Sequence, residues 1–295
     1  MFDNVSFKIE NFSKERFHNF TANYVGEIPL EKQDFFEIFW YNLRIKYYKI
    51  SRKLYVSNSL HKFYNAEFNK IVNDNWDNFT LEDLKKTVKL LSDAFGTEPE
   101  QMKLYGKFEF GFNVNTSPHR PYQDIILRFE SVVNTTRNPF DIFPNPNGKP
   151  HSKFCSFCDY KIKAYDKGKQ SGNPRKNILR YEISNQNIIN TRKVLKMYAP
   201  TIADLLKEES WKNCYEYALS RFDQIRILPF PTENIELYSK MFCYANPIIG
   251  SDYKSLLKKR QGELKKVHDE YKNSRGSPHG LVRQKIIENF NLLLI

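Results

Sequence analysis

The run Lys163-Ala-Tyr-Asp-Lys167 alternates polar and apolar side chains. A period of two is typical of a β-strand with one apolar face and one polar face. The same alternation appears in Leu179-Arg-Tyr-Glu182 and, further upstream, in Lys107-Phe-Glu-Phe-Gly-Phe-Asn113. We therefore predict three strands, each with one face available for polar chemistry.

Parity decides which side chains share a face, because successive strand residues point to opposite sides. If the Phe-rich side of the upstream strand joins a common core, the opposite side of the sheet gathers a tyrosine, two carboxylates and several cations. Such a set suits metal-assisted phosphodiester chemistry on DNA. By parity this face carries Lys107, Glu109, Asn113, Lys163, Tyr165, Lys167, Arg180 and Glu182.

The connections between these runs indicate how the strands pair. Residues 138–150 hold four prolines and predict a loop, and Gly168–Lys176 is a short basic connection. Short connections usually join antiparallel neighbours. We predict an α+β fold: a mostly antiparallel sheet with helices packed on one face and a basic DNA-binding groove on the other. Helices are expected from Thr80, capped with Asp83, and over 123–134.

The whole chain has 295 residues and a formal net charge of +12. Excess positive charge favours polyanionic partners such as nucleic acid. No apolar stretch is long enough to span a bilayer, and no membrane partner is expected. Four cysteines in a chain of this length do not make a disulfide framework, which favours a reducing cytoplasm.

The chemistry expected of the polar face centres on Tyr165. Its hydroxyl is a weak nucleophile at neutral pH, and Lys163 and Lys167 are expected either to lower its pKa or to hold the phosphate. Glu109 and Glu182 are expected to hold a divalent cation. The alternative is an ordinary solvated sheet face, which alternating Lys and Glu residues usually make.

The three runs resemble the rolling-circle replication initiators, the family that includes the filamentous-phage gene II nicking proteins and related plasmid initiators. The similarity is carried by Lys163–Lys167, by Leu179–Glu182, by the upstream Phe-Glu109-Phe and by Thr201-Ile-Ala-Asp-Leu-Leu206. The opening Met-Phe-Asp3 is also similar to the usual start of these proteins. It is strongest over 103–206. The His-hydrophobic-His signature of other rolling-circle enzymes is absent.

The resemblance implies a site-specific DNA nickase that leaves a 5′-phosphotyrosine and a 3′-hydroxyl primer. It implies Tyr165 as nucleophile, Lys167 at the phosphate, and Glu109 and Glu182 as ligands of Mg²⁺ or Mn²⁺. The expected partners are a single-stranded or hairpin origin and a host helicase, in the cytoplasm of a bacterium that carries the phage or plasmid. A homodimer is left open.

Three regions are predicted: a strand-rich DNA-binding subdomain over 1–100, a catalytic nicking core over 101–210, and a helical region with DNA contacts over 211–295. Further DNA contacts are predicted at Lys163, Lys169, Arg175, Lys176, Arg180, Arg120, Lys258, Lys259 and Arg260.

Three alternatives stay open. The chain could be a non-catalytic DNA-binding protein, such as a repressor or packaging factor, or a relaxase-like or transposase-like nickase. His151, Cys155 and Cys158 also have the spacing of half a zinc site.

Overall fold

The computed structural model describes residues 1–72, 74–115, 122–132, 140–142, 152–171, 177–228 and 277–294. Within these residues, ten strands form one sheet in the order β2-β3-β4-β5-β1-β6-β11-β10-β9-β8, and β7 pairs with β12 in a second sheet. All neighbouring strands in both sheets are antiparallel. The predicted α+β class is confirmed. The strands are β1 (Phe2–Ile9), β2 (Leu30–Glu31), β3 (Phe35–Trp40), β4 (Leu43–Tyr48), β5 (Lys53–Ser57), β6 (Lys103–Asn115), β7 (Phe129–Val132), β8 (Asp141–Ile142), β9 (Ser152–Ser156), β10 (Tyr160–Asp166), β11 (Ile178–Asn185) and β12 (Ile225–Ile227).

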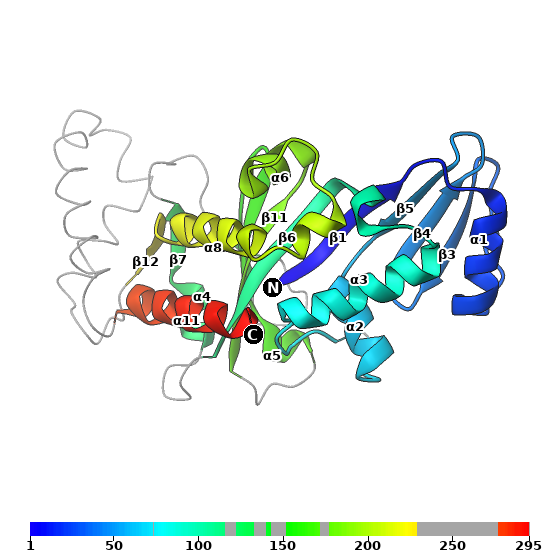
Figure 1. Ribbon diagram of the computed structural model, residues 1–295. Helices are drawn as coiled ribbons and strands as arrows, with labels where there is room; N and C mark the ends of the chain where they lie inside the picture. The colour runs from blue at the N-terminus through cyan, green and yellow to red at the C-terminus, as the bar shows by residue number, and fades with distance from the viewer. Residues whose placement is uncertain are drawn as a thin grey trace.

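The helices fall into two groups along the sheet (Figure 1): α1 to α3 accompany the strands of the N-terminal half, whereas α8 and α11 lie beside β6 and β11. The helices are α1 (Lys14–Phe20), a π-helical turn η1 (Thr21–Val25), α2 (Leu60–Phe68), α3 (Leu81–Phe95), a 3-10 turn η2 (Pro99–Gln101), α4 (Tyr122–Leu127), α5 (Lys167–Gln170), α6 (Ile188–Leu195), α7 (Ile202–Leu205), α8 (Glu208–Phe222) and α11 (Pro278–Leu293).

The Phe-rich face of β6 is buried under α8, as its alternation predicts. Phe110 and Phe112 contact Tyr217 and Tyr215 of this helix in edge-on ring pairs. Tyr181 of the neighbouring β11 lies on the same side and donates a hydrogen bond to the Ala218 carbonyl. The alternation of apolar residues in the sequence therefore identifies the face of the sheet that the helices cover.

In the N-terminal half, Phe95 near the end of α3 packs on Phe7, Phe12 and Phe20. The start of α3 is the predicted capping box: the Thr80 hydroxyl accepts from an amide of the first turn, and a carboxylate accepts from the Thr80 amide. This cap fixes where the helix begins, because it satisfies donors that have no partner within the helix.

The sheet is continuous across residue 100, because β1 pairs directly with β6. Strands from the first two predicted regions thus share one sheet and one core. The three-region division stays a prediction.

Two expectations need correction. Residues 123–134 were predicted to be helical, but the helix ends at Leu127, and Phe129–Val132 is a strand that pairs with β12. The polar face is also not an open groove throughout. Asn113 donates hydrogen bonds to the carbonyls of Trp76 and Asp77, so the chain after α2 crosses over this part of the face. Among the described helices, none has the length and apolarity to cross a membrane.

Candidate functional site

The candidate site is built on β10, β11 and β6, three adjacent strands of the sheet. Their register sets Tyr165 opposite Arg180, and Lys163 opposite Glu182. On the next strand, β6, Gly111 stands opposite Glu182, and Glu109 stands two pairs further along, opposite Ser184. Side chains in such rows share a face, and diagonal neighbours remain within reach. The structure therefore places the three strands side by side, with the predicted polar residues on one face.

The side chains meet in a connected set of polar contacts. The Tyr165 hydroxyl donates a hydrogen bond of 2.8 Å to Glu182 Oε2. Lys163 Nζ lies 2.6 Å from Glu109 Oε1 and 3.3 Å from Glu182 Oε1. Lys163 therefore bridges the two carboxylates, rather than presenting its charge only outward as expected for a DNA contact.

The two carboxylates differ in their affinity for protons. Glu109 is 1% exposed and Glu182 2% exposed. Burial and the nearby charge of Glu109 raise the pKa of Glu182 to about 7. Burial also acts to raise the pKa of Glu109, but Lys163, a hydrogen bond with Glu182, and Lys107 together hold it below its usual value. The pair thus shares one proton near neutral pH, as close carboxylates do.

The expectation for the Tyr165 pKa is wrong in direction. Burial and the negative charge of Glu182 raise it well above its usual value. The two flanking lysines do not reverse this, because Lys163 is engaged with carboxylates and Lys167 with other partners. Tyr165 is therefore a phenol that donates its proton to Glu182, not a phenolate stabilised by lysines.

Lys167 does not continue the strand. It is the first residue of α5, which Asp166 caps by accepting from the Lys169 amide. Its Nζ donates to Asn75 Oδ1 and, at 2.9 Å, to Gln170 Oε1. Burial and the charge of Arg180 lower the Lys167 pKa to about 8.

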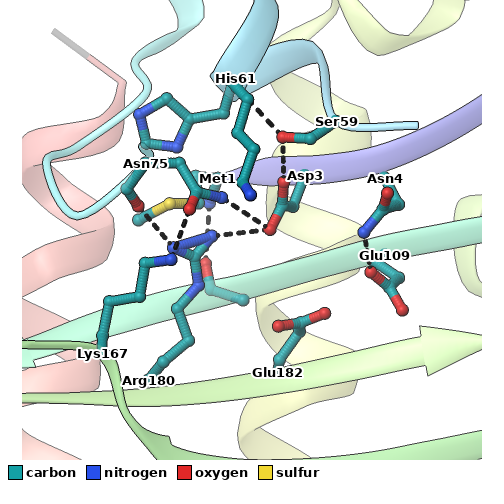
Figure 2. A network of polar contacts seen from close by, with 12 residues as sticks. Met1, Asp3, Asn4, Ser59, His61, Asn75, Glu109, Lys167, Arg180 and Glu182 are labelled. Carbon is teal, nitrogen blue, oxygen red and sulfur yellow. Dashed lines mark hydrogen bonds and ion pairs between the residues drawn. The ribbon is translucent and has the colours of Figure 1, made fainter. Parts of the chain in front are cut away.

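Arg180 does not face DNA. It is fully buried, with Nη2 at 3.0 Å from Asp3 Oδ2 and Nη1 at 2.9 Å from the Asn75 carbonyl. Asp3 also accepts from Ser59 and Asn75. Figure 2 shows this cluster beside the carboxylates of Glu109 and Glu182. The segment that covers the sheet here leaves the guanidinium no exposed surface, so its predicted DNA contact is replaced by a structural role.

These groups open into a cavity of about 710 Å³. Its lining includes Tyr165, both glutamates, Lys163 and Lys167, together with the exposed Lys169. Five lysines and four carboxylates line it in all, so the groove is only slightly basic in formal charge. Among these described lining residues, Tyr165 is the one aromatic side chain. The other predicted DNA contacts lie outside the described residues: Arg120, Arg175, Lys176, Lys258, Lys259 and Arg260.

The carboxylate pair has the donor chemistry that Mg²⁺ or Mn²⁺ requires. Magnesium is commonly held by one or two carboxylates, with water and phosphate oxygens completing its shell. In the structure, the ammonium group of Lys163 lies between Glu109 and Glu182, which indicates that a positive charge is favoured at this position. Within the described ranges, no group of three His, Cys, Asp or Glu side chains forms a larger metal cluster. Cys155 is buried and Cys158 exposed, and His151 lies outside the described residues.

Sequence reasoning missed Asn75 and undervalued Asp3 and Gly111. Asp3 was noted only as part of the similar N-terminal start, and Asn75 belongs to a connection without any strand or helix pattern. Gly111 has a steric role: a Cβ there would lie 2.5 Å from the Tyr181 carbonyl oxygen. Only glycine allows β11 to approach β6 this closely beside Glu182.

Comparisons with known proteins are sparse. Neither protein-family models nor curated proteins match the chain. Among solved structures, the chain is similar to a rolling circle replication initiator protein from Geobacillus stearothermophilus, at 12% sequence identity and a TM-score of 0.44. The similarity covers 79% of this chain and 88% of that one. A likeness this distant carries no argument about function, which has to come from the site.

Proposed function

We propose that this protein nicks one strand of DNA through Tyr165 and stays attached to the cut end, as an initiator of rolling-circle replication. The observation that carries the proposal is the hydrogen bond from the Tyr165 hydroxyl to Glu182 inside a solvent-reaching cavity. It pairs a nucleophile with an acceptor for its proton, which is the arrangement that nucleophilic catalysis requires. The sequence resemblance of the same strands supports the choice of DNA as substrate.

In this proposal the Tyr165 oxygen attacks the phosphorus of a backbone phosphodiester while Glu182 Oε2 accepts the phenol proton. A bond forms between tyrosine oxygen and phosphorus as the bond from phosphorus to O3′ breaks. The leaving O3′ takes up a proton from water. The products are a 5′-phosphotyrosine and a free 3′-hydroxyl primer, and the ester retains the capacity to be rejoined.

The remaining side chains hold the phosphate. Lys163, Lys167 and Lys169 line the cavity and offer positive charge to its oxygens. Glu109 and Glu182 are the residues that would hold Mg²⁺ or Mn²⁺. Such an ion, when bound, would polarise the phosphoryl oxygen and offset developing negative charge.

A covalent-adduct assay tests the proposal. Purified protein is incubated with Mn²⁺ and 3′-labelled single-stranded oligonucleotides that tile the DNA encoding it, and adducts are resolved on a denaturing gel. We expect one oligonucleotide to give an adduct that Tyr165→Phe abolishes. Tyr198→Phe, at an exposed tyrosine elsewhere, is the control. An adduct that persists in Tyr165→Phe would remove the assignment.

One observation favours a second function, that of a non-catalytic DNA-binding protein. Lys163 and the proton that Glu109 and Glu182 share already balance the charge of the two carboxylates, so the cluster is neutral without a metal ion. The variant Glu182→Gln distinguishes the nicking function from the non-catalytic one, because it should abolish adduct formation if the site is catalytic. Under the second function no adduct forms in any protein, and salt-sensitive DNA binding survives the substitution.

A further inference from the structure

A second hollow lies on the N-terminal half of the sheet, away from Tyr165. Its volume is about 610 Å³, and its lining consists of cations, tyrosines and two serines, with no carboxylate. We call it the tyrosine hollow and define it by six residues. They are Arg44, Lys46, Lys53, Tyr48, Tyr55 and Tyr105.

Strand register explains why these side chains gather. β4 pairs with β5 so that Lys46 stands opposite Tyr55, and Tyr48 stands opposite Lys53. The alternate residues of both strands, such as Ile45 and Val56, are fully buried in the core. The hollow therefore lies on the face that the helices do not cover, where apolar packing cannot account for its tyrosines.

The tyrosines form a chain of contacts across the strands. The ring centroids of Tyr48 and Tyr55 are 5.3 Å apart, and those of Tyr55 and Tyr105 are 4.9 Å apart, both edge to face. All three rings remain partly exposed. Partly exposed aromatic rings among cations are the surface on which unpaired bases stack while the backbone phosphates meet positive charge.

The charge around the hollow is positive after its ion pairs are considered. Glu37 pairs with Arg44 and approaches Lys46 at 3.7 Å, so one carboxylate serves two cations at the rim. Lys53 adds a third cation. An anionic ligand would therefore gain attraction here, whereas an acid-free lining offers nothing to a cationic one.

The tyrosine hollow also adjoins the cavity of Tyr165. Consecutive residues of β5 and the turn after it line the two spaces, Ser57 the hollow and Asn58 the cavity. Along β6, Tyr105 lines the hollow and Lys107 the cavity. A chain molecule seated in the hollow thus has a direct path along the sheet to the nucleophile.

We propose that the tyrosine hollow binds single-stranded DNA by base stacking and leads the strand to Tyr165. The inference rests on the proposed function for the identity of the strand as DNA. Binding itself requires neither a metal ion nor cleavage.

Fluorescence anisotropy with a labelled oligothymidylate, measured in EDTA on the full chain, tests the inference. We expect Tyr55→Leu to weaken binding by about 5-fold to 150-fold, the range for losing one stacked base. The double variant Lys46→Gln/Lys53→Gln should reduce the slope of log affinity against log salt by about 1.4, for two lost phosphate contacts to a single strand. The double variant also covers the case in which the Leu variant does not fold, because Lys46 and Lys53 are partly exposed and Gln keeps most of the length of their side chains.

Matched controls lie on the helix-covered side. Tyr24→Leu removes an exposed tyrosine that packs on Trp40, and Lys86→Gln/Lys89→Gln removes two exposed lysines of α3. These proteins should bind like the wild type. Binding by the hollow variants that equals the controls would overturn the inference, as would a Tyr55→Leu loss that is equal for duplex and single strand.

The design separates this inference from the nicking proposal. Binding through the hollow without any adduct supports the inference and removes only the nicking proposal. Adduct formation together with normal oligonucleotide binding by all hollow variants overturns the inference alone.

Discussion

Replacing Lys163 with Met tests whether the carboxylate pair is a cation site. Lys163 Nζ lies 2.6 Å from Glu109 and 3.3 Å from Glu182, and its side chain is 21% exposed. At an effective dielectric constant of about 20, these contacts amount to about 6 and 5 kcal/mol of attraction before desolvation. The cost of desolvating the three charged groups cancels much of this attraction. In the variant, Glu182 can also take up a proton, which relieves part of the repulsion between the two carboxylates. We expect Lys163→Met to lose about 3 kcal/mol of unfolding free energy, at the low end for breaking a buried ion pair.

Lys107→Met is the matched control. Lys107 pairs with the same oxygen, Glu109 Oε1, at 2.8 Å, but its side chain is 48% exposed. Exposed ion pairs contribute at most about 1 kcal/mol. A chain of this size loses about 2 °C of melting temperature per kcal/mol. Measured by circular dichroism in EDTA, Lys163→Met should melt about 6 °C below the wild type, and Lys107→Met at most about 2 °C below it.

Added Mn²⁺ then gives the decisive readout. A ligand at 100 times its dissociation constant stabilises a protein by about 2.7 kcal/mol. In Lys163→Met the ion no longer competes with the ammonium group that bridges the two carboxylates, and only the more exposed Lys107 remains near Glu109. Mn²⁺ should therefore restore most of the lost melting temperature. The double variant Lys163→Met/Glu182→Gln should not respond. If Mn²⁺ raises the melting temperature of this double variant as much as that of Lys163→Met, the carboxylates are not the site.

Three further predictions concern the same strands. Gly111→Ala should cost about 2 kcal/mol or more in urea unfolding, because its Cβ would lie 2.5 Å from the backbone oxygen of Tyr181 and a strand has to move. The pKa of Glu182 is about 7 in the folded state and 4.5 ordinarily, so the folded state binds a proton more tightly. The stability that this proton gives, at most about 3 kcal/mol, should be lost as pH rises from 4.5 through 7. Urea midpoints measured in EDTA should show this fall for the wild type and not for Glu182→Gln. The folded-state Lys167 pKa of about 8 is below its ordinary value of 10.5, so the folded state binds fewer protons between these values and stability should rise from pH 8 to 10.5. Lys167→Met should remove that rise, and an unchanged rise would show that Lys167 does not titrate as described.

The common face of Tyr165, Lys163, Glu182 and Glu109 was predictable, because strand parity depends only on local alternation. Parity fails where a strand ends. Asp166 caps a short helix, so the strand ends there and Lys167 does not continue the row of Lys163 and Tyr165, although it lines the same cavity. The sequence does contain this signal, because Asp is a common N-cap residue. Asp166 also fits the alternation of the strand, however, so the sequence alone does not show that the strand ends there.

The burial of Arg180 was beyond sequence reasoning. Alternation correctly placed it on the polar face, but not under the connection that contains Asn75. Contacts between residues 105 positions apart leave no periodic signal in either segment. For the same reason the tyrosine hollow could be recognised only after β4, β5 and β6 were aligned.

The two charged clusters of the polar face are built for different tasks. Arg180 has a carboxylate and a carbonyl as fixed partners, and Asp3 is held by a hydroxyl and an amide besides. A buried group with this many partners keeps its charge and position whatever enters the cavity. The neighbouring pair of Glu109 and Glu182 is held by Lys163, the more exposed Lys107, hydrogen bonds from Asn4 and Tyr165, and a shared proton. The lysine contacts and the proton can be replaced. An incoming phosphate or cation would therefore rearrange the glutamate cluster and leave the arginine cluster in place. This difference supports our proposal that Tyr165 and Glu182 carry the chemistry, since a reaction requires groups whose protonation and partners can change, next to groups that cannot move.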